Sequence, residues 1–344
     1  VSDQADWLPP GTQLWRLASG SVLQRLGLAL RLGVSGWWQA TRAILGARRD
    51  GWVYVPYPAP LTLWWMSFCP RRWRPRCVAD AYISIWDSMF RDRGHGSTAG
   101  LLSRMVWRFE RRSLRVAHRV LVDTQANRLQ MIQDFGLEPG NIVSLPLAID
   151  EQAFLGIAPR PAGSDAPLRV LFVGTLVPLH GIEVVLGAIE ALADDPRFDF
   201  RLIGDGQMGG VVEAFVQRVM PRNLTWVREW CGLQRIVGEI EEASICLGVF
   251  GGQEKAARVL PFKLYMYLAA GKPVVTQARM SVPDGAPAVP ISGTTSDPLS
   301  LAEALLALAT DQDMRVQRGR QSRDYYRDWL ANARLELAWE KLIR

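Results

Sequence analysis

Apolar and polar positions alternate along this chain with two different periods. Short apolar runs recur, and most are followed by a stretch in which apolar residues return every three or four positions. The runs predict buried strands and the stretches predict amphipathic helices, because side chains repeat about every 2 residues along a strand and about every 3.6 along a helix. Strands that alternate with helices pair in parallel, so the pattern predicts an α/β protein with helices layered on parallel sheets.

The first half of the chain follows this rhythm less closely than the second. Residues 1–50 are rich in Leu, Arg and Trp and read as mostly helical, without the strand and glycine-rich turn that usually open a Rossmann-like domain. Either a first strand–helix unit is missing from this sequence or the first domain is atypical. The elements expected next are strands at Val53–Pro56, Cys77–Ile85, Arg119–Val122 and Ile142–Leu145, with helices at Leu101–Ala117 and Gln125–Phe135.

Residues 156–168 are rich in Pro, Gly and Ser, which is typical of a linker and indicates a domain boundary. After this segment the alternation becomes regular, which predicts a doubly wound domain with ligands at the carboxyl ends of its strands. The expected strands are Arg169–Val173, Phe198–Ile203, Leu224–Val227, Ile245–Phe250 and Pro273–Thr276. The expected helices are Ile182–Ala193, Val211–Val219, Gln234–Glu242, Pro261–Ala270, Leu299–Thr310 and a closing helix from Tyr325 to Ile343.

The composition fits two globular domains. The chain has 344 residues, of which 49% are hydrophobic and 22% charged, enough for a core in each half. The apolar runs are too short to span a membrane and no cleavable signal segment is expected at the start, so the cytosol is the expected location. Four scattered cysteines and three distant histidines show no metal-ligand spacing, and no metal site is predicted.

The positive charge of the chain lies in its first half. Residues 1–150 carry 19 Arg, no Lys and 11 acidic residues, a charge of +8, whereas the remainder carries −2. A basic half can face nucleic acid, anionic lipid or an anionic substrate. The sequence shows no zinc finger, RNP strand or obvious helix-turn-helix, so no nucleic-acid partner is predicted.

The stretch Leu63–Arg76 places Trp beside Arg in the sequence L-W-W-M-S-F-C-P-R-R-W-R-P-R. Trp rings lie at the depth of the lipid headgroups and Arg attracts anionic lipid, so residues 63–76 are predicted to contact the inner face of a membrane. The alternative is a buried helix with Arg at its end.

Two glycine-rich turns follow neighbouring strands of the second half. The sequence F-V-G-T-L-V-P-L-H-G ends a strand, turns at Gly174 and begins a helix at Gly181. A helix N-terminus attracts anions through its dipole and its N–H groups, so this turn predicts a phosphate site. A generic turn between strand and helix is the alternative. A G-D-G turn at Gly204–Gly206 ends the next strand and is expected to lie beside the first turn.

The strongest signal is the segment Lys255–Pro273, which follows a buried strand and two glycines. Pro261 suits the first turn of a helix, where its missing N–H costs nothing. Arg258 and Lys263 flank that helix start, so two cations and several backbone donors are expected at one point. A diphosphate is the ligand that this arrangement predicts, because charge-assisted hydrogen bonds to phosphate are strong. The alternative is that both cations lie on a solvated surface.

Taken together, these motifs resemble the family 4 glycosyltransferases of the GT-B fold. The resemblance is carried by F-V-G-T-L-V-P-L-H-G-I-E, F-R-L-I-G-D-G and R-V-L-P-F-K-L-Y-M-Y-L-A-A-G-K-P-V-V-T, and it covers about residues 119–320. It implies two Rossmann-like domains that face a cleft. Residues 1–156 would form the acceptor side, joined by a C-terminal helix at 325–344, and residues 157–324 would bind the nucleotide sugar.

The resemblance also implies roles for single residues and a type of reaction. The positions that match the family near the diphosphate are Gly174, Gly181, Arg258 and Lys263, and Asp205 matches the turn that lines the cleft. Arg258 and Lys263 would stabilise the leaving diphosphate, with His180 as a third candidate donor. The expected transfer retains the anomeric configuration and needs neither metal nor cofactor, with the nucleotide diphosphate sugar as a substrate.

This sequence departs from the family pattern in the same segments. Thr175 and His180 stand where the family often has Arg or Lys, and Arg258 and Met266 stand at its paired glutamates. Met266 cannot accept a hydrogen bond from a ribose hydroxyl as Glu does, so the ribose must be held in another way or bound weakly.

A second group of polar residues follows a strand in the first half. Asp80, Ser84 and Asp87 belong to the sequence D-A-Y-I-S-I-W-D-S, which also resembles the family. Alternation along an extended strand would place Asp80 and Ser84 on one face and Asp87 on the other. The functional interpretation is contact with the acceptor or the sugar, with Asp87 as a catalytic candidate, and the alternative is capping of the strand end.

These observations favour a transferase that moves a hexose-type sugar from a UDP- or GDP-sugar to an acceptor hydroxyl, lipid-linked for many members of the family, in surface polysaccharide, lipopolysaccharide or glycolipid assembly. An inactive homologue that acts as a binding or partner subunit is the alternative suggested by Thr175 and Met266. A nicotinamide oxidoreductase is disfavoured because no G-x-G-x-x-G opens a helix near either domain start.

Overall fold

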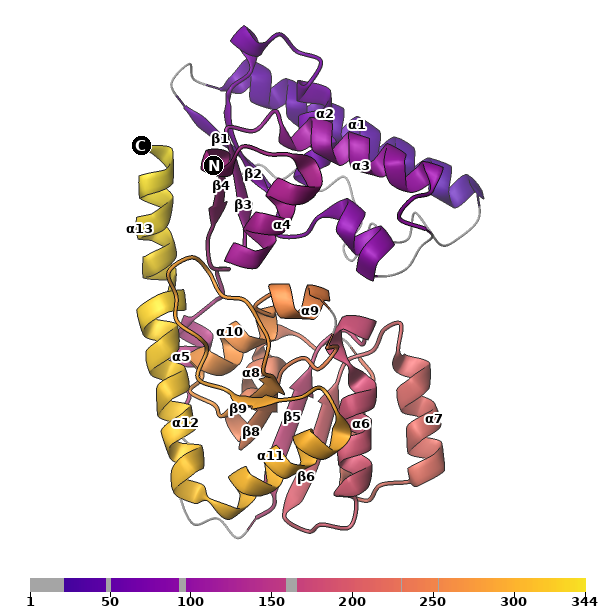
Figure 1. Ribbon diagram of the computed structural model, residues 1–344, viewed down its shortest axis with the longest axis vertical. Coiled ribbons are helices and arrows are strands. Elements are labelled where there is room, and N and C mark those ends of the chain that lie inside the picture. The colour runs from indigo at the N-terminus through magenta and orange to yellow at the C-terminus, as the bar shows by residue number, and fades with distance from the viewer. Residues whose placement is uncertain (1–21, 48–50, 93–96, 159–165, 230, 253) are drawn as a thin grey trace. The chain divides into compact units, whose positions relative to one another are not determined.

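The chain folds into two compact units, which are described separately. The computed structural model describes residues 22–47, 51–92, 97–158, 166–229, 231–252 and 254–344, so parts of the expected helical start and of the expected linker lie outside the described residues (Figure 1). The N-terminal unit comprises Val1–Asp123 and Asn127–Ser144, and the C-terminal unit comprises Thr124–Ala126 and Leu145–Arg344.

The boundary between the units falls before Leu145, earlier than the linker composition predicts. Phe154 and Ile157 explain the difference, because both are buried in a hydrophobic core of the C-terminal unit. The closing segment 325–344 also groups with that unit and not with the N-terminal one. Tyr326 is fully buried in the same core and donates a hydrogen bond of 3.0 Å to Glu151.

The N-terminal unit contains a parallel sheet with the strand order β1-β2-β3-β4. The strands are β1 (Trp52–Val55), β2 (Arg76–Asp80), β3 (Arg119–Val122) and β4 (Ile142–Ser144). Val78, Val120 and Val122 are buried in these strands, where branched side chains pack well on a pleated backbone.

Three helices of this unit lie side by side, with α2 in contact with both α1 and α3 (Figure 1). These three are α1 (Val22–Gly46), α2 (Ala59–Met66) and α3 (Leu101–Leu114), and the unit also contains α4 (Gln125–Phe135). It has 3-10 turns at Arg71–Trp73 and Pro139–Asn141 and a π-helical turn at Asp87–Asp92. The apolar sequence of α2 follows from its place between two helices, where Leu63 and Met66 are completely buried. Among the described residues, no helix is both long enough and apolar enough to cross a membrane.

The C-terminal unit contains a parallel sheet with the strand order β10-β9-β8-β5-β6-β7. The strands are β5 (Leu168–Val173), β6 (Phe198–Ile203), β7 (Leu224–Val227), β8 (Ile245–Leu247), β9 (Val274–Gln277) and β10 (Ser292–Thr294). The chain adds strands to one side of β5, then returns to add β8 on its other side. The sheet is therefore doubly wound, as the sequence predicts.

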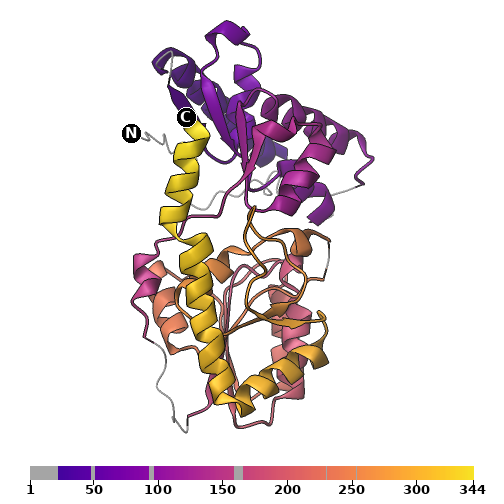
Figure 2. The same ribbon diagram turned by 60° about the vertical axis from the view of Figure 1, so that its left-hand side comes forward.

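Helices cover both faces of this sheet. The helices are α5 (Gln152–Leu155), α6 (Ile182–Ala191), α7 (Gly209–Val219), α8 (Leu233–Glu242), α9 (Glu254–Arg258), α10 (Phe262–Ala269), α11 (Pro298–Thr310), α12 (Gln312–Tyr325) and α13 (Asn332–Ile343), with a 3-10 turn at Pro178–His180 and a π-helical turn at Tyr326–Leu330. One core contains side chains of α6, α7 and α11, and a second contains side chains of α8, α10 and the end of α12 (yellow in Figure 2).

One expected strand is much shorter in the structure. The strand predicted at Cys77–Ile85 ends at Asp80, so Ser84 and Asp87 do not alternate along it. The buried carboxylate of Glu110, on α3, accepts hydrogen bonds from the main-chain N–H groups of Ile85 (2.9 Å) and Trp86 (2.7 Å). These bonds satisfy donors at the start of the helical turn that follows, so Glu110 stabilises a helical start where the sequence predicts the end of a strand.

Candidate functional site

The candidate site lies where the order of the six-stranded sheet reverses, between β5 and β8. In parallel sheets of this topology, ligands bind outside the carboxyl ends of the two strands at the reversal. The segments that follow these two strands are residues 174–181 after β5 and residues 248–252 after β8. Both are glycine-rich, and they meet at this edge of the sheet.

Close packing of the backbone explains the glycines of these loops. A Cβ on Gly181 would lie 2.4 Å from the carbonyl carbon of Phe250, and a Cβ on Gly204 would lie 2.2 Å from the carbonyl oxygen of Gly174. Gly181 also has a φ of +61°, a conformation that favours glycine. The main-chain N–H of Phe250 donates to the carbonyl of His180 at 3.0 Å. The turns after β5, β6 and β8 therefore contact one another directly through the backbone.

Lys263, in the first turn of α10, places its ammonium group beneath these loops. Its side chain is only 5% exposed, and Nζ lies 3.7 Å from the centre of the Phe172 ring and 3.4 Å from the carbonyl oxygen of Gly248. A Cβ on Gly174 would lie 2.9 Å from the same Nζ, so only glycine leaves room for it. Burial lowers the pKa of Lys263 well below its usual value.

His180 lies beside this lysine. Its ring packs edge-on against Phe172 with 5.7 Å between ring centres, and a Cβ on Gly174 would lie 3.0 Å from its Cε1 atom. Burial, together with the charge of Lys263, lowers the pKa of His180 to about 2, against the opposing effect of a hydrogen bond with the Thr175 backbone. His180 is therefore neutral at pH 7, and its buried Nδ1 has no hydrogen-bond partner among the described residues.

The chemistry of this cluster favours an anion. Lys263 forms no ion pair with the residues that the structure describes, and its nearest polar neighbour is one carbonyl oxygen. A buried cation without a counter-ion is costly, whereas a buried cation beside an anionic ligand is stabilised. Together with the unpaired ring nitrogen of His180, this cation can receive phosphate oxygens at the end of β5.

Arg258 is the last residue of α9, a helix that lies beside the turn Pro178–His180. Its carbonyl oxygen accepts a hydrogen bond from the hydroxyl of Thr124. The structure therefore brings Arg258 to the same end of the sheet as Lys263. Its role toward a diphosphate stays a prediction.

Asp205 forms its own ion pair next to these loops. Its carboxylate accepts a hydrogen bond of 2.9 Å from Arg228, which also pairs with Glu213, and the Arg228 hydrogen bond lowers the pKa of Asp205. A Cβ on Gly206 would lie 2.8 Å from the carbonyl oxygen of Leu176, so this turn packs on the turn after β5. Asp205 therefore helps to hold the wall of the candidate site.

Pro261 and Met266 have different surroundings. Pro261 is the N-cap of α10 and not, as expected, in its first turn, and it has the extended conformation that precedes a helix. Met266 is 7% exposed and belongs to the apolar core of the C-terminal unit. The structure thus gives Met266 apolar neighbours, and a hydrogen bond from this position to ribose is not available.

Asp87 lies in the N-terminal unit and already has partners. Arg91 lies 3.4 Å from its carboxylate and forms a closer ion pair of 2.6 Å with Asp134. The hydroxyl of Ser84 accepts a hydrogen bond from the Asp87 N–H and donates one to Glu110. These contacts agree with the capping alternative for Ser84, and a catalytic role for Asp87 stays a prediction.

Sequence reasoning missed several residues of the site. Phe172 supports both Lys263 and His180, and Gly248 supplies the carbonyl that faces Lys263. A Cβ on Gly248 would lie 2.4 Å from Oγ1 of Thr276, so only glycine leaves room for the Thr276 side chain at this position. The run L-G-V-F-G-G after β8 was the available signal, because glycines at a strand end often mark such approaches.

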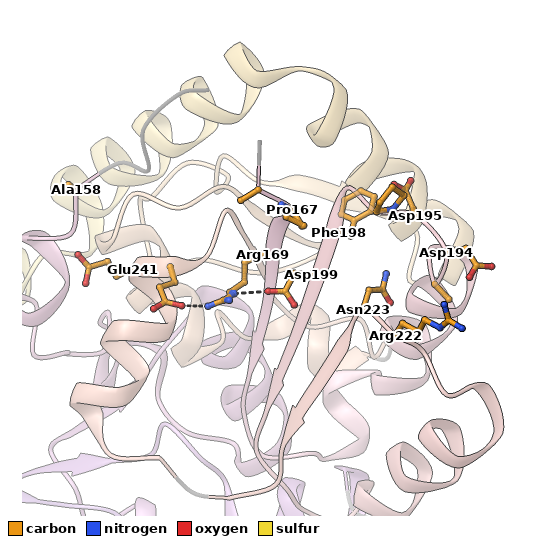
Figure 3. Close-up of a pocket in the computed structure, with 14 residues that line it drawn as sticks. Ala158, Pro167, Arg169, Asp194, Asp195, Phe198, Asp199, Arg222, Asn223 and Glu241 are labelled. Atoms are coloured by element: carbon orange, nitrogen blue, oxygen red, sulfur yellow. Dashed lines mark hydrogen bonds and ion pairs between the residues drawn. The ribbon is translucent and has the colours of Figure 1, made fainter. Parts of the chain in front are cut away.

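A separate pocket lies at the amino ends of the strands of the same sheet, opposite the candidate site. Figure 3 shows it at the amino ends of β5, β6 and the segment before β7, where Arg169 pairs with Asp199 at 2.9 Å and with Glu242. Ligands of doubly wound sheets bind at the carboxyl ends of the strands. This pocket is therefore distinct from the candidate site. The described residues contain no group of three or more metal-ligating side chains.

Comparison with solved structures defines the class of fold. A sucrose-phosphate synthase from Thermosynechococcus elongatus is similar at a TM-score of 0.69 and 16% identity, over 94% of this chain and 79% of that one. HepE from Anabaena in complex with UDP is similar at 0.66 and 14% identity, over 88% and 81%. A structure described as trehalose-6-phosphate from E. coli, bound with UDP-2-fluoro glucose, is similar at a TM-score of 0.66 and 14% identity, over 92% of this chain and 78% of that one. The fold is that of the GT-B glycosyltransferases.

Sequence comparison adds a family match over part of the chain. Residues 167–311 match the family model described as glycosyl transferases group 1. This segment is therefore similar to the group 1 glycosyltransferases, and it contains every candidate residue of the C-terminal unit. No curated protein matches the sequence.

Proposed function

We propose that the protein transfers a hexose-type sugar from a UDP- or GDP-sugar to an acceptor hydroxyl, with retention of the anomeric configuration and without a metal ion. The observation that carries this proposal is the buried ammonium group of Lys263, which lies against Gly174 and His180 without an acidic partner among the described residues. A donor diphosphate supplies the charge that this cation lacks.

Charge on the leaving group is the quantity that the site must stabilise. When the glycosidic bond to the donor breaks, negative charge grows on a diphosphate oxygen while the sugar becomes oxocarbenium-like. Lys263 and Arg258 are fixed cations near that oxygen, and such preorganised groups need no reorganisation at the moment of reaction. In a retaining reaction of this type, the acceptor hydroxyl enters on the face of the leaving group and passes its proton to the phosphate.

UDP is the first nucleotide to test. Two of the similar structures contain UDP and UDP-2-fluoro glucose, in proteins that are 14% identical to this chain. The basic N-terminal unit suits an acceptor that carries a lipid or another anionic group. We therefore place the reaction in bacterial-type surface polysaccharide, lipopolysaccharide or glycolipid assembly, on the cytoplasmic face of a membrane.

Thermal denaturation with UDP, GDP and ADP and their sugars tests the donor site. A ligand present at a hundredfold excess over its Kd stabilises the folded protein by about 2.7 kcal/mol, which raises Tm by a few degrees. We expect this shift with UDP or GDP and its loss in Lys263→Met. Lys341→Met, which removes a lysine near the end of α13, is the matched control and should keep the shift. A shift of equal size in Lys263→Met would contradict the proposal.

A second candidate function is a binding or partner subunit without transferase activity. Met266 favours it, because its thioether lies in the apolar core where the family pattern has a glutamate that holds ribose. Release of UDP or GDP from the donor sugar on addition of acceptor separates the two functions. Nucleotide binding without any release would favour the subunit.

A further inference from the structure

Helix α1 is apolar on two opposite sides. Leu32 and Ala40 are buried against the rest of the N-terminal unit, as the inner face of a surface helix should be. The outer side carries a second apolar stripe at helical spacing. Its members and their exposed fractions are Leu30 69%, Val34 42%, Trp37 49%, Trp38 40% and Leu45 81%.

The exposed stripe continues onto the neighbouring helices. The indole N–H of Trp65, in α2, donates to the carbonyl of Gly33 at 3.0 Å, and its ring lies beside Phe68. The guanidinium of Arg112, in α3, lies 4.5 Å from the centre of the Phe68 ring. Contacts therefore run from α1 across the end of α2 to α3.

The outer side of α3 extends this surface. Leu101, Met105, Arg108 and Arg112 are exposed and repeat at intervals of four, three and four residues, so they share one face of the helix. We define the α1–α3 surface as the exposed stripe of α1 together with Trp65, Phe68 and this face of α3.

The charge around this surface has one sign. The described side chains of helices α1 and α3 and of the turn Arg71–Trp73 include eight Arg, and Glu110 is their single acidic residue. Glu110 is 1% exposed and accepts hydrogen bonds from within the unit, so it does not offset the charge outside. Among the described residues of these three elements, the charged side chains that are not buried are thus all arginines.

We propose that the α1–α3 surface binds a membrane that contains anionic lipids, with α1 lying in the plane of the headgroups. Apolar side chains of such a helix enter the acyl boundary, Trp rings stay at the headgroups, and Arg side chains contact lipid phosphates. The structure shifts the contact from α2, whose Leu63 and Met66 are buried, to α1 and α3.

Two other occupants fit the surface less well. A second copy of this chain would bring like charges together on both sides of the contact, because a two-fold interface pairs a surface with itself. A nucleic acid would neutralise the arginines but would leave Leu30, Val34 and Leu45 in water. A membrane satisfies the charge and the apolar side chains together.

Sedimentation with lipid vesicles tests this inference without donor or acceptor, so its result does not depend on the proposed transferase activity. Vesicles of phosphatidylcholine alone are compared with vesicles that also contain phosphatidylglycerol. We expect binding to the anionic vesicles, weakening as NaCl rises because salt screens the arginines. The variant Leu30→Ser, Val34→Ser, Trp37→Ser should need at least about tenfold more lipid for half-binding, since three inserted side chains are lost.

A matched control removes three exposed apolar side chains of the C-terminal unit. Met220→Ser, Leu299→Ser and Leu337→Ser together should leave vesicle binding unchanged. A second variant, Arg104→Gln with Arg108→Gln, keeps the apolar side chains and should weaken binding to anionic vesicles, which covers the case in which the first variant fails to fold. Failure of the wild type to bind anionic vesicles would overturn the inference. Equal vesicle binding by the wild type and by the Leu30→Ser, Val34→Ser, Trp37→Ser variant would overturn it too. So would a wild type that forms a dimer without binding vesicles, if that variant is monomeric.

Discussion

Two buried lysines of the C-terminal unit show how one residue type takes opposite roles. Nζ of Lys272 donates to the carbonyl oxygens of Glu241 and Ala243 at 2.8 and 2.9 Å, where it satisfies acceptors at the end of α8. Nζ of Lys263 has a single carbonyl neighbour at 3.4 Å and an aromatic ring. Sequence alone does not separate them, because each follows an apolar stretch and precedes another. Hydrogen-bond satisfaction, visible only in three dimensions, makes Lys272 structural and Lys263 a candidate for binding.

Replacing each lysine by Met should move stability in opposite directions. Burial lowers the pKa of Lys263 in the folded protein below its value of 10.5 in the unfolded chain. Below pH 10.5 the unfolded chain therefore binds this proton more strongly than the folded protein does. Protonation of Lys263 thus lowers the free energy of unfolding at pH 7. Lys263→Met should therefore raise the free energy of unfolding, by about 1–3 kcal/mol. Lys272→Met loses two hydrogen bonds of a charged group and should lower it by about 2–4 kcal/mol.

Urea denaturation of both variants at pH 7 measures these changes. A loss of stability in Lys263→Met as large as that in Lys272→Met would show that the folded protein already satisfies the Lys263 ammonium group. The site would then have no need of an anionic ligand.

At the scale of elements, the rhythm of apolar positions predicts most of the C-terminal unit. β6 and β7 have the expected bounds, and α10 and β9 differ from theirs by one residue at each end. Helix α9 and strand β10 were not expected, because segments of five and three residues are too short to show a period. The expected strand after Cys77 was too long because its last part forms a helical turn, whose first N–H groups are capped by Glu110, more than 20 residues away. A cap supplied by a distant residue has no local signal.

The glycines of the site provide a test of its backbone packing. Gly181→Ala places a side chain at a φ of +61° and 2.4 Å from the backbone of Phe250, so we expect a loss of about 2–4 kcal/mol of stability and of nucleotide binding. Gly238→Ala is the matched control, because a Cβ there meets nothing within 4 Å inside α8. It should raise stability by about 0.5–1 kcal/mol. Equal effects of the two substitutions on chemical denaturation would contradict the described packing of the loops after β5 and β8.

At the scale of the whole molecule, the two units have separate cores. The core of the N-terminal unit is built from α2, α3 and the four-stranded sheet, and the two cores of the C-terminal unit lie on either side of the larger sheet. The family match at residues 167–311 covers the second unit alone. Sequence motifs therefore predicted the fold of the C-terminal unit well, whereas the exposed stripe on α1 has no motif and is recognised only from its exposure in the fold.

Separate cores should give separate unfolding transitions. Ten of the 14 Trp lie at or before Trp107, so tryptophan fluorescence reports mainly on the N-terminal unit, and calorimetry reports on both. A bound nucleotide should raise the midpoint of one calorimetric transition by a few degrees and leave the fluorescence midpoint in place, because it stabilises only the unit that binds it. A single transition that moves as a whole, seen by both methods, would show that the units unfold together.

The low proton affinity of Lys263 has a practical consequence for chemical biology. Burial lowers the pKa of Lys263, so a larger fraction of its amine is unprotonated at a given pH than for an exposed lysine, and the unprotonated amine is the nucleophile toward acylating and aldehyde reagents. The chain has four lysines, and the other three are Lys255, Lys272 and Lys341. A diphosphate analogue that carries a mild electrophile would deliver it to the buried amine of Lys263 at the candidate site, and would tag this protein at a single atom.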